Sequence, residues 1–203
     1  MKRLIEKNIN TPEEYNRIYF ERQDRGTDSF DEKRWRQMLT YYRGGKLVDL
    51  GCLDSLITVL AKMQYPESEC WGIDQASEAI KNMQLMYPSI YWKSEDLNQT
   101  HFPANYFSYV TLGEVIEHLE KPELAVKEAI RILRKKGVLV LSTPYNEKHN
   151  EVDGERHLWS FDLDDIRTLL SPYGSIKIRL FPQIHIPYTK YHHKNIIAFC
   201  TKK

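Results

Sequence analysis

The sequence has few cysteines, no long apolar run and almost no net charge. Cys52, Cys70 and Cys200 are odd in number and far apart, so they form no metal-binding pair and suggest a reducing compartment. The first residues lack the apolar core of a signal peptide, and no run approaches the length that spans a membrane. We therefore expect a cytoplasmic protein with no membrane partner.

The near-neutral charge bears on the choice of partner. Twenty-nine Lys and Arg stand against 28 Asp and Glu, a formal net charge of +1 at pH 7. This balance gives no overall attraction for nucleic acid, although a local basic patch can still exist. The 41% apolar and 28% charged residues are ordinary for a globular protein, and 203 residues suit one domain.

Short apolar runs alternate with amphipathic ones from residue 46 onward. This alternation predicts an α/β fold, a doubly wound and mostly parallel sheet with helices on both faces. The last two strands have no helix between them and can form an antiparallel hairpin at the sheet edge. The strands are expected at 46–51, 70–74, 89–96, 107–114, 138–144, 175–181 and 194–203, and the helices at 55–64, 77–88, 121–137 and 162–174.

Residues 1–45, before the first strand, look helical. The run from Thr11 begins with a capping residue, and Pro12 follows at the first helical position. We expect residues 1–45 to be a helical N-terminal lid over the carboxyl ends of the strands. The lid and the core, 46–203, should form a single domain of 1–203.

Three features should meet at the carboxyl ends of the strands, where such sheets bind ligands. The turn 49–52 brings backbone N–H groups and a helix N-terminus close to a ligand. Asp74 ends the second strand, where its carboxylate can accept ribose hydroxyls, and Asp96 ends the third, where it can accept from the amine of adenine. Each feature alone fits a simple turn or a helix cap. Together they indicate an adenosine site.

The runs LVDLGC (47–52), WGIDQASEAI (71–80), SEDLN (94–98) and EVIEHLEKP (114–122) also carry a resemblance. With HLWSFDLDDIRTLL (157–170), they make residues 44–203 resemble the class I S-adenosylmethionine-dependent methyltransferases. The segment 114–144 looks like the small ubiquinone-biosynthesis-type and related bacterial branch. The resemblance implies a Rossmann-like, seven-stranded sheet with a reversed last strand, and S-adenosyl-L-methionine as the cofactor.

The resemblance also implies which residues bind that cofactor. Asp74 would hold the ribose hydroxyls, with Gln75 beside it. The other implied positions are Asp96 and Leu97 at the adenine, Gly113 and Glu114 near the sulfonium, and Asp49, Gly51, Cys52 and Leu53 at the methionine part.

The glycine turn departs from the pattern of the family. The family continues Gly-x-Gly after the first glycine, whereas Leu53, Asp54 and Ser55 follow Gly51 here. A leucine at position 53 disfavours a positive φ and places a side chain where the backbone would approach the ligand. Ser55 is expected to cap the next helix. We predict that the turn still binds the cofactor, because the two carboxylates and the segment 113–119 are kept.

A sulfonium methyl group is already electrophilic, so the protein must align a nucleophile, exclude water and, where needed, remove a proton. The candidate catalytic residues for proton removal are Glu114, His118 and His157. If 114–118 begins a helix, Glu114 and His118 lie one turn apart on one face, with Glu117 adjacent. His157 follows the fifth strand and could return to the same site.

The same residues leave a metal-dependent alternative open. Glu114, Glu117, His118 and His157 would suit a divalent cation that polarises a diol, and the set resembles that of small-RNA 3′-terminal 2′-O-methyltransferases. Family members without a metal carry the same run, and there the histidines can serve the backbone. We therefore predict no metal site.

Three functions follow from these observations. The first is an S-adenosylmethionine-dependent methyltransferase acting on the oxygen, or in second place the nitrogen, of a small molecule. The second is a metal-assisted RNA 2′-O-methyltransferase, which the near-zero net charge disfavours. The third is a non-catalytic, methyltransferase-like binding module that uses the atypical turn. A nicotinamide dehydrogenase would need a glycine fingerprint that this sequence lacks.

Overall fold

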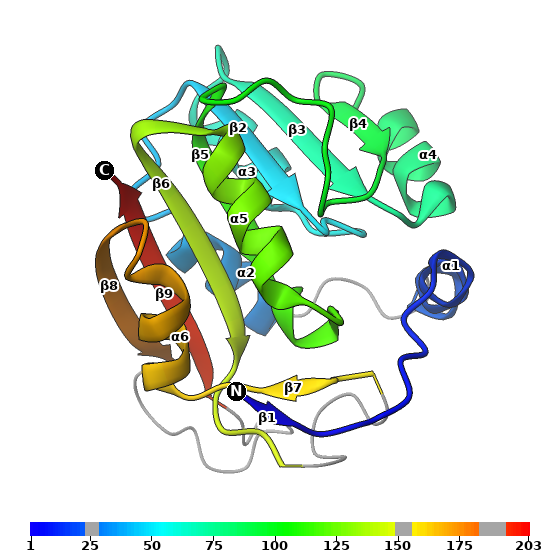
Figure 1. Cartoon of the computed structure of the whole chain (residues 1–203). Helices are drawn as coiled ribbons and strands as arrows, with labels where there is room; N and C mark the ends of the chain where they lie inside the picture. Colours follow the sequence, from blue (N-terminus) through cyan, green and yellow to red (C-terminus); the bar gives the residue numbers. More distant parts are fainter. Residues whose placement is uncertain (23–28, 149–155, 183–193) are drawn as a thin grey trace.

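The computed structural model describes residues 1–22, 29–148, 156–182 and 194–203. Its centre is a seven-stranded sheet in the order β4-β3-β2-β5-β6-β9-β8 (Figure 1). Neighbouring strands from β4 to β6 are parallel, whereas β9 runs antiparallel to both β6 and β8. This confirms the predicted α/β sheet with its reversed last strand. The strands are β2 Lys46–Leu50, β3 Glu69–Asp74, β4 Tyr91–Ser94, β5 Phe107–Gly113, β6 Leu133–Pro144, β8 Gly174–Phe181 and β9 Asn195–Lys202.

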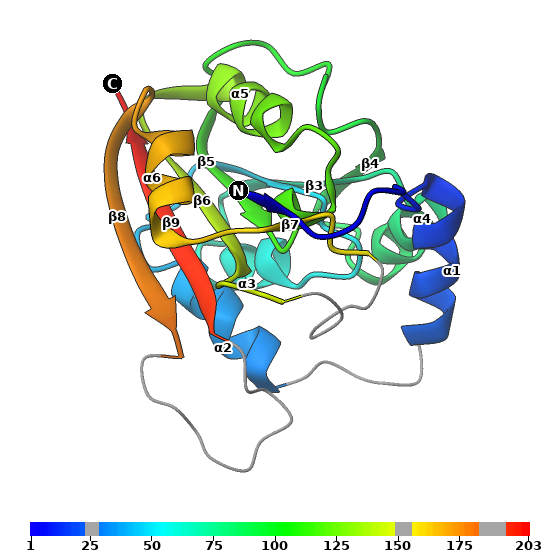
Figure 2. The same cartoon turned by 60° about the horizontal axis from the view of Figure 1, so that its bottom comes forward.

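Helices cover both faces of the sheet. Alternate residues of its strands point to opposite sides, and buried apolar side chains lie on both of them. Val48 and Leu50 of β2 belong to the core that contains α5 and α6, whereas Leu47 belongs to the core that contains α2, α3 and α4. Figure 2 shows α5 on one side of the sheet and α2 and α3 on the other. The helices are α1 Pro12–Arg22, α2 Ser29–Met38, α3 Ile57–Gln64, α4 Ser77–Met86, α5 Pro122–Ile132 and α6 Leu163–Leu170. Within the described parts of the chain, none of the helices combines the length and the apolar character needed to cross a membrane.

The junction between α5 and β6 differs from the prediction. The helix ends at Ile132 and not at Gly137, and the strand begins at Leu133. Leu133 is fully buried and pairs with Phe107, before a register shift in the ladder between β5 and β6. Burial of this leucine in the sheet thus takes precedence over the helical pattern of 133–137. The basic residues 134–136 stay exposed.

Among its described residues, the N-terminal segment 1–45 contains one element besides α1 and α2. A short strand, β1 Lys2–Arg3, pairs antiparallel with β7 Trp159–Ser160 in a separate two-stranded sheet. From there the chain passes the carboxyl ends of the parallel strands and reaches α1, which packs on α4 (Figure 1). The Thr11 hydroxyl oxygen accepts from the backbone N–H of Glu14 at 3.2 Å, as a helix cap does. This path places residues of 1–45 beside the turn after β2.

Candidate functional site

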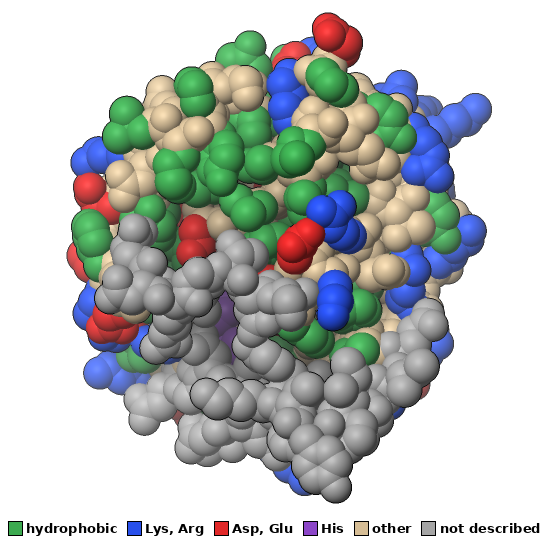
Figure 3. All heavy atoms as spheres, turned by 180° about the vertical axis from the view of Figure 1, so that it is seen from behind, with side chains coloured by type: hydrophobic (Ala, Val, Ile, Leu, Met, Phe, Trp, Pro, Cys, Tyr) green, Lys and Arg blue, Asp and Glu red, His purple; other side chains and the backbone are tan. Residues whose placement is uncertain are grey.

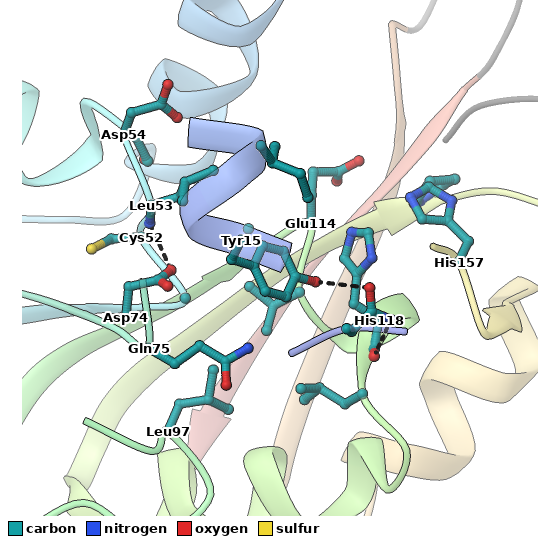
Figure 4. Close-up of a pocket in the computed structure, with 18 of the residues that line it drawn as sticks. Tyr15, Cys52, Leu53, Asp54, Asp74, Gln75, Leu97, Glu114, His118 and His157 are labelled. Carbon is teal, nitrogen blue, oxygen red and sulfur yellow. Dashed lines mark hydrogen bonds between the residues drawn. The ribbon is translucent and has the colours of Figure 1, made fainter. Parts of the chain in front are cut away.

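A cavity of about 530 Å³ lies at the carboxyl ends of β2, β3 and β5. Figure 4 shows the turn after β2 and Asp74 on one side, Glu114, His118 and His157 on another, and Tyr15 of α1 between them. Figure 3 shows part of a histidine side chain on the face opposite to that of Figure 1. The N-terminal segment contributes Asn8, Asn10, Tyr15, Ile18, Phe30, Asp31, Arg34 and Trp35 to the lining.

The turn after β2 bends back on β3. The N–H groups of Gly51 and Cys52 both donate to the carbonyl oxygen of Ile73, at 2.8 and 3.0 Å. Gly51 has a φ of 75°, and a Cβ atom there would lie 2.5 Å from a methyl group of Val115. Only glycine fits this position, since it alone combines a positive φ with such a close approach.

Leu53 also adopts a left-handed conformation, with a φ of 39°. The turn therefore adopts a conformation that leucine disfavours. Its N–H group donates to Asp74 Oδ2 at 2.8 Å, and its side chain packs on Tyr19 and on the first turn of α4 while it also lines the cavity. These contacts offset the cost of a left-handed backbone conformation at a leucine, which is about 1–2 kcal/mol.

Asp74 is buried at the end of β3 and holds two segments together. Besides the bond from Leu53, its Oδ1 atom accepts from the N–H of Ala76 at 2.8 Å, in the turn just before α4, whose N-cap is Ala76. Burial raises the pKa of Asp74, and the N–H groups of Ala76 and Leu53 limit the rise. A carboxylate offers about four acceptor positions. Asp74 therefore retains the capacity to accept two ribose hydroxyls, which fits the expected cofactor.

Asp96 does not line the cavity. Its side chain is exposed, and its Oδ1 atom accepts from the backbone and side-chain nitrogens of Asn98, both at 2.9 Å. Leu97 and Asn98 line the cavity instead, together with Gln75. The turn after β4 thus presents an apolar side chain and an amide on the side of the cavity where the adenine base of the cofactor is expected. Asn98 carried no sequence signal, because asparagine after an aspartate is common in any turn.

Asp49 lies behind the turn and not at the cavity surface. Only 1% of it is exposed; its Oδ1 atom accepts from the Thr111 hydroxyl at 2.6 Å, and Oδ2 has no hydrogen-bond partner among the described residues. Burial raises its pKa to about 7.

Cys52 lines the cavity, but burial raises the pKa of its thiol, so it is no thiolate nucleophile. Ser55 lies just before α3, whose N-cap is Leu56, and its hydroxyl accepts from Ile57 N–H at 3.2 Å.

Arg34 of α2 is a site residue that the sequence analysis missed. It is 6% exposed and is the one Lys or Arg among the described lining residues. It donates to the Ser142 hydroxyl at 2.9 Å and to Asp31 at 2.7 Å, and lies 3.1 Å from Glu114 Oε1. Burial lowers the pKa of Arg34, but the charges of Glu114 and Asp31 outweigh it and raise the pKa overall. A signal existed: Arg34 shares one helical face with Phe30 and Met38.

Glu114 does not begin a helix. It has a φ of 57°, and only a single 3-10 turn, Ile116–His118, follows. The predicted alignment of Glu114 and His118 on one helical face is therefore wrong. Glu114 turns toward Arg34 and accepts from the Ser142 hydroxyl at 2.7 Å. Gly113, the residue before it, also lines the cavity.

Glu117, His118 and His157 come together as a cluster, with one potential ligand atom of each within 4.8 Å of the others. The two imidazole rings stand 4.6 Å apart and nearly perpendicular. Glu117 is fully buried, and neither of its carboxylate oxygens has a hydrogen-bond partner in the described parts of the chain. Burial, followed by the charge of Glu114, raises its pKa to about 8. Two imidazoles and an orphaned carboxylate fit a divalent cation.

The N-terminal segment fixes the wall beside this cluster. Asn10 donates from its amide nitrogen to the carbonyl oxygens of His118 and Arg156, each at 2.9 Å. The Tyr15 hydroxyl donates to Asn10 Oδ1 at 3.4 Å, and its ring meets the His118 ring edge-on (Figure 4). The cavity thus has a turn-and-carboxylate end and a histidine end.

Comparison with known proteins agrees with this geometry. A family model described as "Methyltransferase domain" matches residues 48–141. Over 120 residues, the chain is 24% identical to a "Probable S-adenosylmethionine-dependent methyltransferase" of Mycobacterium tuberculosis, covering 57% of this chain and 44% of that protein. The chain therefore spans less than half the length of the curated relatives it matches.

Two solved structures share the fold. A SAM-dependent methyltransferase from Archaeoglobus fulgidus superposes with a TM-score of 0.73 at 15% identity, over 92% of this chain and 99% of that one. A chain from the complex with the Haloferax volcanii Trm112 methyltransferase activator gives a TM-score of 0.74 at 13% identity, over 94% and 98%. The match over residues 48–141 and the shared fold relate this chain to the S-adenosylmethionine-dependent methyltransferases, whose cofactor is S-adenosyl-L-methionine.

Proposed function

We propose that this chain is a methyltransferase that uses S-adenosylmethionine to methylate an oxygen atom of a small molecule. The observation that carries the proposal is the two-ended cavity. One end holds the buried Asp74 beside the turn after β2, and the other holds His118 and His157. When bound, the cofactor supplies an electrophilic methyl group, and the histidine end offers groups that can take the proton of an attacking hydroxyl.

Each part of the cofactor has a partner at the first end. Asp74 would accept from the ribose hydroxyls, with Gln75 beside it, and the turn 51–53 would lie against the methionine part. Leu97 and Asn98 would contact the adenine. Arg34 would pair with the cofactor's carboxylate, because a guanidinium binds carboxylates in a bidentate manner.

The charge of the cavity supports a small neutral acceptor over a nucleic acid. One cation, Arg34, faces five acids among the described lining residues: Asp31, Asp54, Asp74, Glu114 and Glu120. A cleft with excess negative charge attracts a cofactor that carries a sulfonium and an ammonium group, and it repels phosphates. A phenol or a sugar hydroxyl fits this environment.

The cofactor part is tested by calorimetry with S-adenosylhomocysteine. We expect heat with the unaltered protein and at least tenfold weaker binding for Asp74→Asn. Asp96→Asn is the matched control, since Asp96 also ends a strand region but lies outside the cavity, and it should bind as the unaltered protein does. Circular dichroism shows whether each variant is folded. A folded protein that gives no heat would favour the non-catalytic binding module.

The acceptor part is tested with cofactor that carries a labelled methyl group. We would offer phenols, catechols and sugars beside an RNA oligonucleotide with a free 3′ end. Label in a small molecule supports the proposal. Label in the RNA alone contradicts it.

The cluster of Glu117, His118 and His157 favours a second candidate, a metal-assisted 2′-O-methyltransferase acting on an RNA end. The three side chains would hold a divalent cation, which polarises a hydroxyl of a vicinal diol. The test measures the binding of added Mn²⁺ by electron paramagnetic resonance. Binding that Glu117→Gln abolishes and Glu114→Gln retains would support this candidate, because Glu114 pairs with Arg34 outside the cluster.

We also propose that residues 1–203 act as one domain in the cytoplasm. Asn10, Tyr15 and Arg34 of the N-terminal segment line the same cavity as the core, which supports a single unit. Cys52, Cys70 and Cys200 are buried free thiols, which suits a reducing compartment.

A further inference from the structure

The two histidines of the cluster have different hydrogen-bond partners on Nδ1. His157 Nδ1 lies 2.5 Å from Glu147 Oε2, and the two side chains are 5% and 2% exposed. His118 Nδ1 lies 3.2 Å from the backbone carbonyl oxygen of Arg156, and its side chain is half-buried. One imidazole therefore meets a buried carboxylate, and the other a neutral carbonyl.

This difference changes what each ring can do. A carboxylate that accepts from Nδ1–H holds the ring in one tautomer, in which Nε2 carries the lone pair. The carboxylate also stabilises the positive charge that appears when Nε2 takes a proton. A backbone carbonyl selects the same tautomer but adds less of this charge stabilisation. The Glu147 carboxylate accordingly fixes the orientation of the His157 ring.

The backbone around Glu147 and His157 fixes their approach. Tyr145 forms a bridge with Phe161, and Asn146 N–H donates to the carbonyl oxygen of Phe161 at 2.9 Å. Leu158 N–H donates to the carbonyl oxygen of Glu117 at 2.8 Å. The segments that carry Glu147, His157 and Glu117 are thus tied to one another next to the cavity, which His157 lines.

We propose that Glu147 is a positioning residue that holds His157 as the Nδ1–H tautomer, so that Nε2 receives the proton of the acceptor. This inference rests on the proposed function. As the acceptor oxygen forms its bond to the methyl carbon, its O–H bond breaks and the proton moves to Nε2. The carbon–sulfur bond breaks at the same time, and its electron pair stays on sulfur. Glu147 touches neither reactant and acts only through His157.

The tautomer can be measured directly. Long-range ¹H–¹⁵N spectra of the full chain with ¹⁵N-labelled histidine distinguish Nδ1–H from Nε2–H, and a His157→Asn spectrum assigns the signals. We expect the Nδ1–H form of His157 in the unaltered protein. In Glu147→Gln, whose amide can donate to Nδ1, we expect the Nε2–H form to become populated. Glu128→Gln is the control, since Glu128 is a buried acid that binds Thr100 and Arg131 and should leave the His157 signals unchanged.

Three results would overturn the inference: an Nε2–H ring in the unaltered protein, a doubly protonated ring at pH 7.5, or no change of tautomer in Glu147→Gln. Calorimetry with S-adenosylhomocysteine separates this test from the proposed function. We expect Glu147→Gln to bind it within twofold of the unaltered protein. If neither protein binds it while the tautomer still responds to Glu147, the methyltransferase proposal fails and the positioning of His157 by Glu147 stands.

Discussion

Replacing Glu117 by glutamine should stabilise the protein, and increasingly so as the pH rises. Glu117 is fully buried, and its two carboxylate oxygens lack hydrogen-bond partners within the described residues. Burial and the nearby charge of Glu114 raise its pKa from 4.5 to about 8. Because the unfolded chain releases this proton more readily than the folded one, ionisation of Glu117 favours unfolding.

The size of the effect follows from the shift. Each pKa unit is worth about 1.4 kcal/mol, and the penalty grows between the unfolded pKa, 4.5, and the folded pKa, about 8. Below pH 4.5 both states hold the proton and the penalty vanishes. Between pH 5 and pH 8 the advantage of Glu117→Gln over the unaltered protein should therefore grow by about 3 kcal/mol.

Urea unfolding at pH 5 and pH 8, with a chelator present, measures this difference. Comparing the two pH values cancels any constant effect of the amide on packing. Glu128→Gln provides a control with little pH dependence. Although burial by itself raises the pKa of Glu128, hydrogen bonds from Arg131 and Thr100 lower it overall below 4.5, so this variant should lose nearly the same stability at pH 5 and at pH 8. An equal gain from Glu117→Gln at both pH values would refute the reasoning.

Three further substitutions test other parts of the site and the fold. Gly51→Ala should cost about 1–3 kcal/mol in urea unfolding, because the new Cβ would meet Val115 and φ is positive; unchanged stability would contradict the close approach. Arg34→Met should weaken S-adenosylhomocysteine binding about tenfold in calorimetry, whereas Arg36→Met, on the exposed side of the same helix, should not. Asp162→Ala should cost about 1 kcal/mol in thermal unfolding, since Asp162 caps α6 through two N–H groups, and a stability equal to that of the unaltered protein would argue against the cap.

Local patterns in the sequence determined the framework of this protein. Continuous apolar runs such as 46–51 and 138–144 predicted strands buried on both faces, and β2 and β6 lie there. The helix-free connection before the last strand predicted its reversal. Asp74 ends a parallel strand at the ligand edge of the sheet and lines the cavity, whereas its binding of a ribose stays a prediction. The strand predictions were confirmed because they depend only on periodicity and chain direction.

Only the tertiary structure decided the details of the site. Leu53 adopts a positive φ because Asp74, 21 positions away, holds its N–H group. Arg34 reaches Glu114 and Ser142 from the N-terminal segment, and Glu147 contacts His157, 10 positions further along the chain. Asp96 instead has a local partner, Asn98, two positions later, and does not line the cavity. A side chain's partner depends on which distant segments fold against it, and burial then sets its charge, so neither can be read from spacing along the chain.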